Sequence, residues 1–482
     1  TSLDEVVRVR AVIVATGTFL NGLVHVGMKN FSAGRLGDFP SMALAQWFKA
    51  QGFAVGRMKT GTVPRIDRNT IDYSRLEAQH GDSPVTFFSF STPPGPPPLP
   101  QLPCHITYTN EATHEIIRGS IDQSPMYAGV IEGIGARYCP SVEDKIMRFP
   151  DKTRHQIFLE PEGLDTVEIY PNGISTSLPL TTQIRLVHSI AGMESARIMR
   201  PGYAIEYDFI DPRGLKASLE TKAVAGLFFA GQINGTSGYE EAAAQGLMAG
   251  INSVRYCRNE EPLVLDRGSS YIGTLIDDLV TKGVEDPYRM MTSRSEYRLV
   301  LRQDNADERL TPIGREYGLV DDDRWALFCR DREVKQAELH RLETTSIKLA
   351  DLRAAAPEGA ELGEIGGSAI ELMRRPYISY DLIAKVIGRG EGVTPAMAQR
   401  IETEIRYAGY IAREERIIRD IQRHENVKIP DDFDYAPIET MTLESREKLT
   451  KIRPRTLAQA GRIPGVSPSD LAQLSIVLLK LK

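Results

Sequence analysis

The sequence predicts an α/β fold built on a doubly wound sheet, with a large inserted domain and an α-helical C-terminal domain. Two observations predict the sheet: the apolar runs 11–17 and 226–231 both end in glycine, and each suits a parallel strand that is covered on both faces. The third observation is a change of composition from about residue 260, where charged residues recur at helical spacing.

These observations divide the chain into three predicted domains. Residues 1–45 and 216–258 form the α/β domain, 46–215 the insertion and 259–482 the helical domain. The insertion is rich in turn signals and short strands. The chain has 482 residues, which is enough to bury a core in each part.

Composition excludes several classes of protein. No apolar run approaches the ~20 residues of a membrane span, and the net charge of -6 means that any polyanion has to bind a local basic patch. The four cysteines form no CxxC pair, which predicts a reducing compartment and a cytoplasmic protein. The chain starts at Thr1 rather than Met and reaches a strand at once, so we expect it to be part of a longer protein.

The strand at 226–230 leads into a glycine-rich turn and a helix rich in small residues. Gly231, Gly235 and Gly238 fall in the turn. This order places exposed N–H groups and the positive end of a helix dipole at the carboxyl edge of the sheet, where open α/β sheets bind ligands. We therefore expect a flavin at this turn; a tight βα turn without a ligand is the alternative.

Six long stretches point to one family. They are Ala15–Gly22, Gly56–Arg65, Met126–Gly133, Arg137–Lys145, Arg200–Asp208 and Gly226–Gly250. Together they resemble the GidA/MnmG family, which modifies the wobble uridine of tRNA. The resemblance implies a Rossmann-like, glutathione-reductase-type domain that binds FAD, with NADH as reductant and methylenetetrahydrofolate as the one-carbon donor. The strand and GGGxxG turn with which the family begins, and the cysteine after them, are not in this chain.

The resemblance also implies a reaction, partners and site residues. With the GTPase MnmE the family adds an aminomethyl or carboxymethylaminomethyl group to C5 of the uridine, and it forms a homodimer that assembles with MnmE into a heterotetramer. Ser41 and Gln232 correspond to FAD contacts, and 135–149 to an NAD-binding segment. The candidate NAD contacts in that segment are Gly135, Arg137, Asp144, Lys145 and Phe149.

Cys139 is the candidate catalytic residue. Ser141 and Asp144 have the spacing of a capping box, so the thiol precedes a predicted helix N-terminus, with Arg137 close by in sequence. Both influences favour a thiolate, which would attack C6 of the uracil ring and make C5 nucleophilic. In the family this cysteine is implicated in activity. The alternative is a small buried side chain without a chemical role.

Arginines at helical spacing are the candidates for tRNA phosphate binding. Ser293 and Glu296 predict a capped helix that carries Arg294, Arg298 and Arg302 on one face, with Arg289 nearby. A second helix, opened by Thr394–Pro395, has Met397, Ile401 and Ile405 on an apolar face. Farther along this helix is a second stripe, which consists of Arg413, Arg416, Arg419 and Arg423. A solvated helix face is the alternative for each stripe.

The last helix is predicted by Ser467 as its cap and Pro468 at its first position. Its apolar stripe, Leu471, Leu474, Leu478 and Leu481, forms either core or a surface for a partner, and the family binds MnmE at this end.

Two rival functions remain open at this point. One is the folate- and FAD-dependent tRNA uracil methyltransferase, whose family lacks the long helical tail. The other is a non-catalytic scaffold that binds tRNA or a GTPase.

Overall fold

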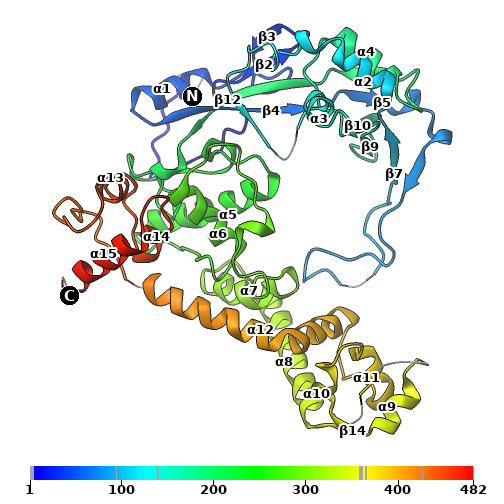
Figure 1. Ribbon diagram of the computed structural model, residues 1–482, viewed down its shortest axis with the longest axis vertical. Helices are drawn as coiled ribbons and strands as arrows, with labels where there is room; N and C mark the ends of the chain where they lie inside the picture. The colour runs from blue at the N-terminus through cyan, green and yellow to red at the C-terminus, as the bar shows by residue number, and fades with distance from the viewer. Residues whose placement is uncertain are drawn as a thin grey trace. The chain divides into compact units, whose positions relative to one another are not determined.

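The structure is a computed structural model that describes residues 5–93, 95–137, 140–357, 362–363, 366–425 and 427–480, with the backbone alone at 420–425 and 480 (Figure 1). The chain forms two compact units. The first comprises Thr1–Phe88, Pro94–Val264 and Leu275–Met290, and the second comprises Ser89–Pro93, Leu265–Thr274 and Met291–Lys482.

The two glycine-ended runs form neighbouring parallel strands in the first unit, as predicted. β1 (Val12–Val14) pairs with β13 (Leu227–Phe229) in the register Val12 to Leu227. A 20-residue helix, α5 (Tyr239–Arg258), follows β13. The expectation that both strands are covered on both faces is wrong for β1, because Val12 is 44% and Ile13 41% exposed, whereas β13 is buried throughout.

Two further sheets come from the predicted insertion and its flanks. The larger has the order β11-β5-β10-β9-β7-β6 and is antiparallel throughout. The other has the order β3-β2-β12-β4-β8, and its long central strands β12 and β4 pair along eight residues. Apolar residues of α2, α3 and α4 pack against the larger sheet in one buried cluster, which includes Ile117, Val142 and Leu186.

The elements of the first unit have the following bounds. The strands are β2 (Leu23–Val26), β3 (Lys29–Ser32), β4 (Val55–Thr62), β5 (Arg65–Asp67), β6 (Glu77–Gln79), β7 (Cys104–Tyr108), β8 (Ile134–Gly135), β9 (Gln156–Pro161), β10 (Glu168–Asn172), β11 (Ile198–Arg200) and β12 (Tyr203–Ile210). The other helices are α1 (Met42–Ala50), α2 (Glu111–Arg118), α3 (Val142–Arg148) and α4 (Leu180–His188), and α6 (Tyr271–Lys282) is shared between the units.

The second unit is almost entirely helical, which confirms the prediction for the C-terminal part. Its helices are α7 (Ala306–Glu316), α8 (Asp322–Thr344), α9 (Leu349–Ala355), α10 (Ala369–Met373), α11 (Tyr380–Ile387), α12 (Pro395–Glu425), α13 (Leu443–Ile452), α14 (Leu457–Arg462) and α15 (Pro468–Lys480), with a short pair β14 (Ser346–Ile347) and β15 (Gly367–Ser368). α8 to α12 surround one apolar core, and α13 to α15 another.

Helix starts in this unit follow the predicted capping residues. The Oγ1 atom of Thr394 accepts a hydrogen bond from the Met397 N–H at 3.2 Å before α12, and the Oγ atom of Ser467 accepts one from the Asp470 N–H at 3.1 Å before α15. Ile401 and Ile405 are buried in the core around α12, as predicted.

The leucine stripe of α15 proves to be core. Leu474 and Leu478 are buried and Leu471 is partly buried against them, so these side chains belong to the core of this part of the chain. Leu481 lies outside the described residues.

One predicted helix is wrong. Residues 294–302 do not form a helix: a single 3₁₀ turn, η6 (Thr292–Arg294), is followed by turns and irregular backbone. Arg294, Arg298 and Arg302 therefore do not share a helical face. Glu296, which was predicted to take part in a capping box with Ser293, forms an ion pair with Arg267 at 2.7 Å.

No described helix is long and apolar enough to cross a membrane. The division into domains at residues 45, 215 and 258 remains a prediction, since the compact units separate the chain only between the α/β part and the helical part.

Candidate flavin cradle and arginine surface

The carboxyl ends of β1 and β13 form a cradle with glycine at both turns. Gly17 has a φ of +55° and Gly231 a φ of +84°, and Gly235 closes the second turn at +78°. L-residues other than glycine rarely adopt this left-handed conformation. Both turns therefore carry no side chain at these positions, at the sheet edge where ligands of open α/β sheets bind. Gly17 is half-buried, and Gly231 and Gly235 are buried.

The buried amide of Gln245 holds the second turn in place. Its Oε1 atom accepts hydrogen bonds from the Gly231 N–H at 3.2 Å and the Asn234 side chain at 2.8 Å. Its Nε2 atom donates to Thr236 at 3.1 Å. Because Gln245 lies in the second turn of α5, these bonds tie the 3₁₀ turn η5 (Gly231–Asn234) to the N-terminal part of that helix.

The two predicted FAD contacts border the first turn of the cradle. A Cβ atom added to Gly17 would lie 3.5 Å from the Gln232 amide oxygen, so the two turns meet here. Gln232 also donates to the hydroxyl of the buried Tyr207 at 3.4 Å, and burial raises the pKa of Tyr207 to about 12. Ser41 is joined to the same region, because its N–H donates to the Phe19 carbonyl at 2.8 Å.

The electrostatics of the cradle differ from the sequence expectation. Glu240 and Glu241 lie in the first turn of α5, so their carboxylates offset the positive helix end. Glu241 is 2% exposed, and its Oε1 atom accepts from the Met290 N–H at 2.6 Å and from Arg289 at 3.3 Å. Arg289 offsets the charge of one of these two carboxylates.

Three buried polar atoms near the cradle have no hydrogen-bond partner in the described part of the chain. They are Oγ1 of Thr16, Oδ1 of Asn234 and Oε2 of Glu241. Buried polar atoms are almost always paired. The turns at Gly17 and Gly231, which carry no side chain, and the unpaired hydroxyl of Thr16 beside them fit a ligand with ring nitrogens, carbonyls and hydroxyls, such as a flavin.

In the predicted NAD segment, Ser141, Asp144 and Lys145 make contacts within the protein. The Ser141 and Asp144 capping box is present, and Asp144 also accepts from the Tyr127 hydroxyl at 3.1 Å. Lys145 donates to the Gly173 carbonyl at 2.9 Å. Asp144 and Lys145 thus hold α3 in place.

The remaining residues of that segment are placed as follows. Gly135 lies on β8, where a Cβ atom would come within 3.3 Å of Lys59. Phe149 is 53% exposed at the end of α3, and Arg137 is exposed. Cys139 lies outside the described residues.

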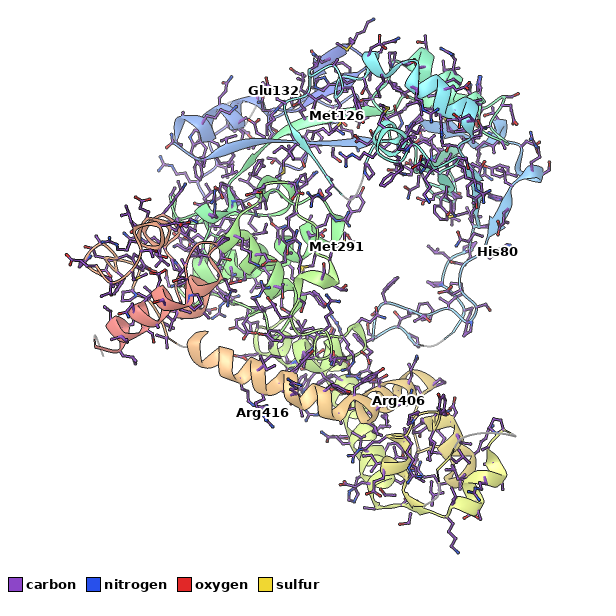
Figure 2. The ribbon with its side chains drawn as sticks, viewed as in Figure 1. His80, Met126, Glu132, Met291, Arg406 and Arg416 are labelled. Atoms are coloured by element: carbon purple, nitrogen blue, oxygen red, sulfur yellow. The ribbon has the colours of Figure 1, made fainter. Side chains whose placement is uncertain are left out.

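Sequence reasoning missed a buried charge network on β12. Glu206 is 3% exposed, and its Oε2 atom lies 2.8 Å from Nε2 of the buried His25. Its Oε1 atom accepts from the N–H groups of Glu132 and Gly133 at 2.9 and 2.7 Å, which attaches the segment before β8 to the sheet (Figure 2). The signal in the sequence is a carboxylate at alternate positions, 206 and 208, of an otherwise apolar strand.

The partners of Glu206 keep it ionised. Burial alone would raise the pKa of Glu206, but the hydrogen bonds from His25, Gly133 and Glu132 and the charge of Arg57 bring it below its usual value. Arg57 also binds Asp208 at 2.8 Å. The network therefore carries fixed charges in the middle of the five-stranded sheet.

Of the five arginines predicted to bind tRNA, two have unengaged guanidinium groups. Arg289 binds Glu241, and Arg302 binds Asp304 at 2.9 Å. Arg294 has an interaction partner within the protein. Arg298 and Arg413 are exposed, and neither makes a hydrogen bond or an ion pair with any residue that the structure describes.

Comparison with known families decides the identity of the chain. The family described as "Glucose inhibited division protein A" matches residues 1–261. Two further models match the helical part, "tRNA modifying enzyme MnmG/GidA C-terminal helical domain" at 322–415 and "tRNA modifying enzyme MnmG/GidA C-terminal helical bundle" at 417–482. The chain belongs to the GidA/MnmG family.

Curated members of the GidA/MnmG family are close in sequence. A protein of Desulfotalea psychrophila named "tRNA uridine 5-carboxymethylaminomethyl modification enzyme MnmG" is 56% identical over 490 residues, which cover 100% of this chain and 76% of the relative. A protein of Geobacter sulfurreducens with the same name is 53% identical, with 97% of this chain and 75% of the relative covered.

Solved structures of the GidA/MnmG family have the same fold. Aquifex aeolicus GidA in crystal form II superposes with a TM-score of 0.87 at 44% identity, over 97% of this chain and 74% of that one. Crystal form I gives the same TM-score at 45% identity, over 97% and 76%. This agreement confirms the predicted fold class, with an α/β cofactor domain and a helical C-terminal part.

Proposed function

We propose that this chain acts as a flavin-dependent enzyme that modifies the wobble uridine of tRNA at C5. The observation that supports this function best is the cradle between β1 and β13, with left-handed glycines at both strand ends, in a member of the GidA/MnmG family. Its curated relatives are named tRNA uridine 5-carboxymethylaminomethyl modification enzymes.

FAD is the cofactor that we assign to the cradle. The backbone at Gly17 and Gly231, the amide of Gln232 and the hydroxyls of Thr16 and Ser41 would hold it. When bound, FAD supplies two-electron redox chemistry, with NADH as the proposed reductant and methylenetetrahydrofolate as the proposed one-carbon donor. Gly235 and Gly238 shape the turn that would bring α5 to the cofactor, and Gln245 holds that turn by hydrogen bonds.

We assign the covalent step to Cys139. Its thiolate would form a bond to C6 of the uracil ring, which gives C5 the electron density to bond to the one-carbon unit. Loss of the C5 proton then expels the thiolate and restores the ring. Among the described residues, Glu206 fixes the chain just before this segment through the N–H groups of Glu132 and Gly133.

The remaining partners follow from the family and are part of the proposal. They are the GTPase MnmE, a homodimer, a heterotetramer with MnmE, and an NAD contact set that includes Gly135, Arg137, Asp144, Lys145 and Phe149. A cytoplasmic location is proposed with them, since the substrate is tRNA.

The visible absorption spectrum of the purified protein tests the function. We expect flavin bands that bleach when NADH is added, and tRNA turnover that Cys139→Ser abolishes while the bands remain. Cys104→Ser is the matched control, because burial and the charge of Glu160 raise the pKa of the Cys104 thiol and keep it protonated. A colourless protein that cannot be reconstituted with FAD would leave the scaffold function in its place.

A further inference from the structure

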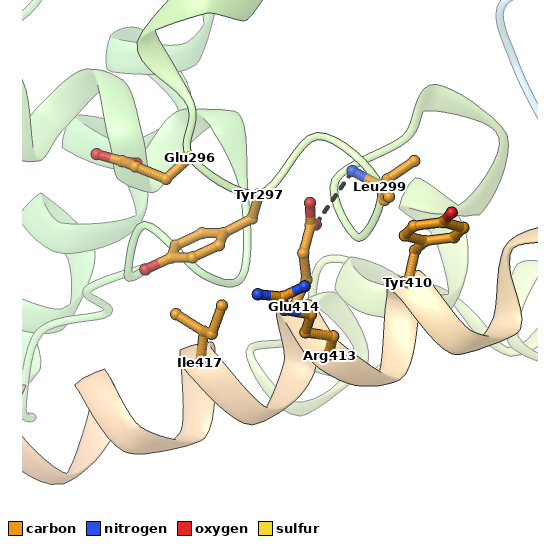
Figure 3. Close-up of a pocket in the computed structure, with 7 residues that line it drawn as sticks. All are labelled: Glu296, Tyr297, Leu299, Tyr410, Arg413, Glu414 and Ile417. Atoms are coloured by element: carbon orange, nitrogen blue, oxygen red, sulfur yellow. Dashed lines mark hydrogen bonds between the residues drawn. The ribbon is translucent and has the colours of Figure 1, made fainter.

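An open groove in the second unit lies between the irregular segment 296–299 and helix α12. Its volume is about 500 Å³, and its lining is mostly apolar. Figure 3 shows the residues that line it, which are Glu296, Tyr297, Leu299, Tyr410, Arg413, Glu414 and Ile417. The volume lies within the range of ~300–1,000 Å³ that is typical of small-ligand sites.

Two tyrosines of different exposure contribute aromatic surface to the groove. Tyr297 is 7% exposed and packs with Leu301 and Ile418, so its ring is fixed. Tyr410 is 65% exposed on α12, and its hydroxyl has no hydrogen-bond partner among the described residues. An exposed ring beside a fixed ring and the side chains of Leu299 and Ile417 is a surface on which a flat heteroaromatic ring can stack.

The groove is lined by two carboxylates and one guanidinium. Glu414 accepts from the N–H groups of Leu299 and Val300 at 3.1 and 3.2 Å, and Glu296 binds the buried Arg267 at 2.7 Å. Both carboxylates are therefore engaged. The guanidinium of Arg413 has no partner in the described part of the chain, so it is the free charge of the groove.

Two neighbouring arginines extend this positive charge. Arg298 follows Tyr297, and Arg416 lies one turn beyond Arg413 on α12; both are exposed and make no ion pair with a described residue. Unpaired arginines around a stacking surface match a nucleic acid whose bases are unpaired, because a duplex hides the faces of its bases.

We propose that this groove holds one unpaired nucleobase of the RNA substrate. The base stacks on Tyr410 against the wall formed by Tyr297, Leu299 and Ile417, and Arg413 donates to the base edge or to the adjacent phosphate. This inference rests on the proposed function, in that it takes tRNA as the substrate, and it adds a base-binding position on the helical unit.

The test compares two RNAs of equal phosphate number, an anticodon stem–loop and a blunt duplex, in binding to the flavin-loaded protein. Tyr410→Ala should weaken binding of the stem–loop by roughly 5- to 100-fold and leave duplex binding unchanged, since stacking needs an unpaired base. Tyr410→Phe should bind like the wild type, because stacking needs only the ring.

The chain offers matched controls for both side chains. Tyr407 is a tyrosine 42% exposed on the same helix that does not line the groove, so Tyr407→Ala should leave both affinities unchanged. Arg416, labelled on α12 in Figure 2, is the exposed counterpart of Arg413 outside the groove, and Arg413→Gln should weaken stem–loop binding more than Arg416→Gln.

Several outcomes would overturn the assignment. Equal losses on stem–loop and duplex for Tyr410→Ala, or equal losses for Tyr410→Ala and Tyr407→Ala, would exclude a base in the groove. Competition by free uridine monophosphate at the concentration at which the stem–loop binds would make it a nucleotide site. Unchanged RNA binding with weakened binding of a GTPase partner would make it a protein surface. A wild-type protein that binds neither RNA would refute the proposed function itself.

Discussion

At the scale of single residues, the cradle depends on backbone conformations that only glycine adopts without strain. Gly231 has a φ of +84°, and an added Cβ atom would lie 3.4 Å from the Cβ atom of Ala242 on α5. We expect Gly231→Ala to lower the free energy of unfolding by about 1–2 kcal/mol and to reduce the flavin retained per protein. Thermal unfolding and the ratio of flavin to protein absorbance measure the two effects.

Gly52→Ala is the control for that prediction. Gly52 has a φ of +79° and open space around it, so the same strain arises away from the cradle. It should lose similar stability while the flavin content stays at the wild-type value. Equal flavin loss in both variants would show that general destabilisation, and not the cradle, accounts for the effect.

The buried carboxylate of Glu206 predicts a dependence of stability on pH. Its pKa in the folded protein lies below the usual value of 4.5, so its ionised form stabilises the fold above that pH, and this stabilisation is lost as the pH falls through the folded pKa. Glu206→Gln should cost about 1.5–3 kcal/mol at neutral pH, the range for hydrogen bonds to a charged group. This loss in the free energy of unfolding should be smaller at acidic pH.

Denaturant unfolding between pH 7 and pH 3 checks the Glu206 prediction. The exposed Glu115 provides the control, since Glu115→Gln should leave the pH profile unchanged. A cost of Glu206→Gln that is the same at both ends of the range would contradict the role of its charge.

At the scale of elements, Glu414 on α12 holds the irregular segment that forms one wall of the groove. Its Oε2 atom accepts from two successive N–H groups, those of Leu299 and Val300. We expect Glu414→Ala to speed hydrogen exchange at these two amides, because both lose their acceptor, and to leave the exchange of α8 unchanged. Mass spectrometry of peptides over 296–302 measures the change.

Glu415→Ala is the corresponding control on the same helix. Glu415 is half exposed, and its ion pair with Arg419 is long at 3.8 Å, so its removal should not alter exchange in 296–302. If Glu414→Ala also leaves exchange there at the wild-type rate, other contacts must hold the segment.

Local sequence signals predicted the elements that depend on local bonds. The capping residues Ser141, Thr394 and Ser467 bond within three residues of themselves, so the start of each helix could be read from the sequence. Likewise the glycine-ended runs predicted the parallel pair β1 and β13.

The features that the sequence did not predict correctly depend on contacts between residues far apart in the chain. The segment 294–302 has the spacing of a capped helix, but Glu414, more than a hundred residues away, takes the N–H groups that a helix would have used. Glu206 was missed for the same reason, since its partner His25 is 181 positions away. The spacing of residue types along the sequence indicates contacts between neighbouring residues, and it does not indicate contacts with such distant partners.

At the scale of the whole molecule, the net charge of -6 means that the proposed RNA substrate has to bind where basic side chains are unpaired, as Arg298 is among the described residues. Arg298→Gln should lower the slope of log affinity against log salt by about 1, the amount expected for one lost phosphate contact. Arg302→Gln should leave the slope unchanged, because Arg302 already binds Asp304. Binding of tRNA at several salt concentrations measures both slopes, and a fall with Arg302→Gln alone would reverse the assignment.

Helix α12 spans the boundary between two regions that separate family models match. It runs for 31 residues, and the boundary between the two helical family models, at 415 and 417, falls inside it. Ile401 and Ile405 fix its angular setting in one core, and Tyr410, Arg413 and Ile417 line the groove farther along.

Because the helix is continuous, an insertion would change both the distance and the angle about the helix axis between these residues. Each residue inserted near 408 would turn everything beyond it by about 100° relative to Ile401 and Ile405. A single-residue insertion would therefore move Tyr410 and Arg413 to a different face of the helix, although the side chains themselves would be unchanged. Homologous chains should accept length changes here only in multiples close to whole turns, and alignments of the family around 406–409 should contain no single-residue gaps.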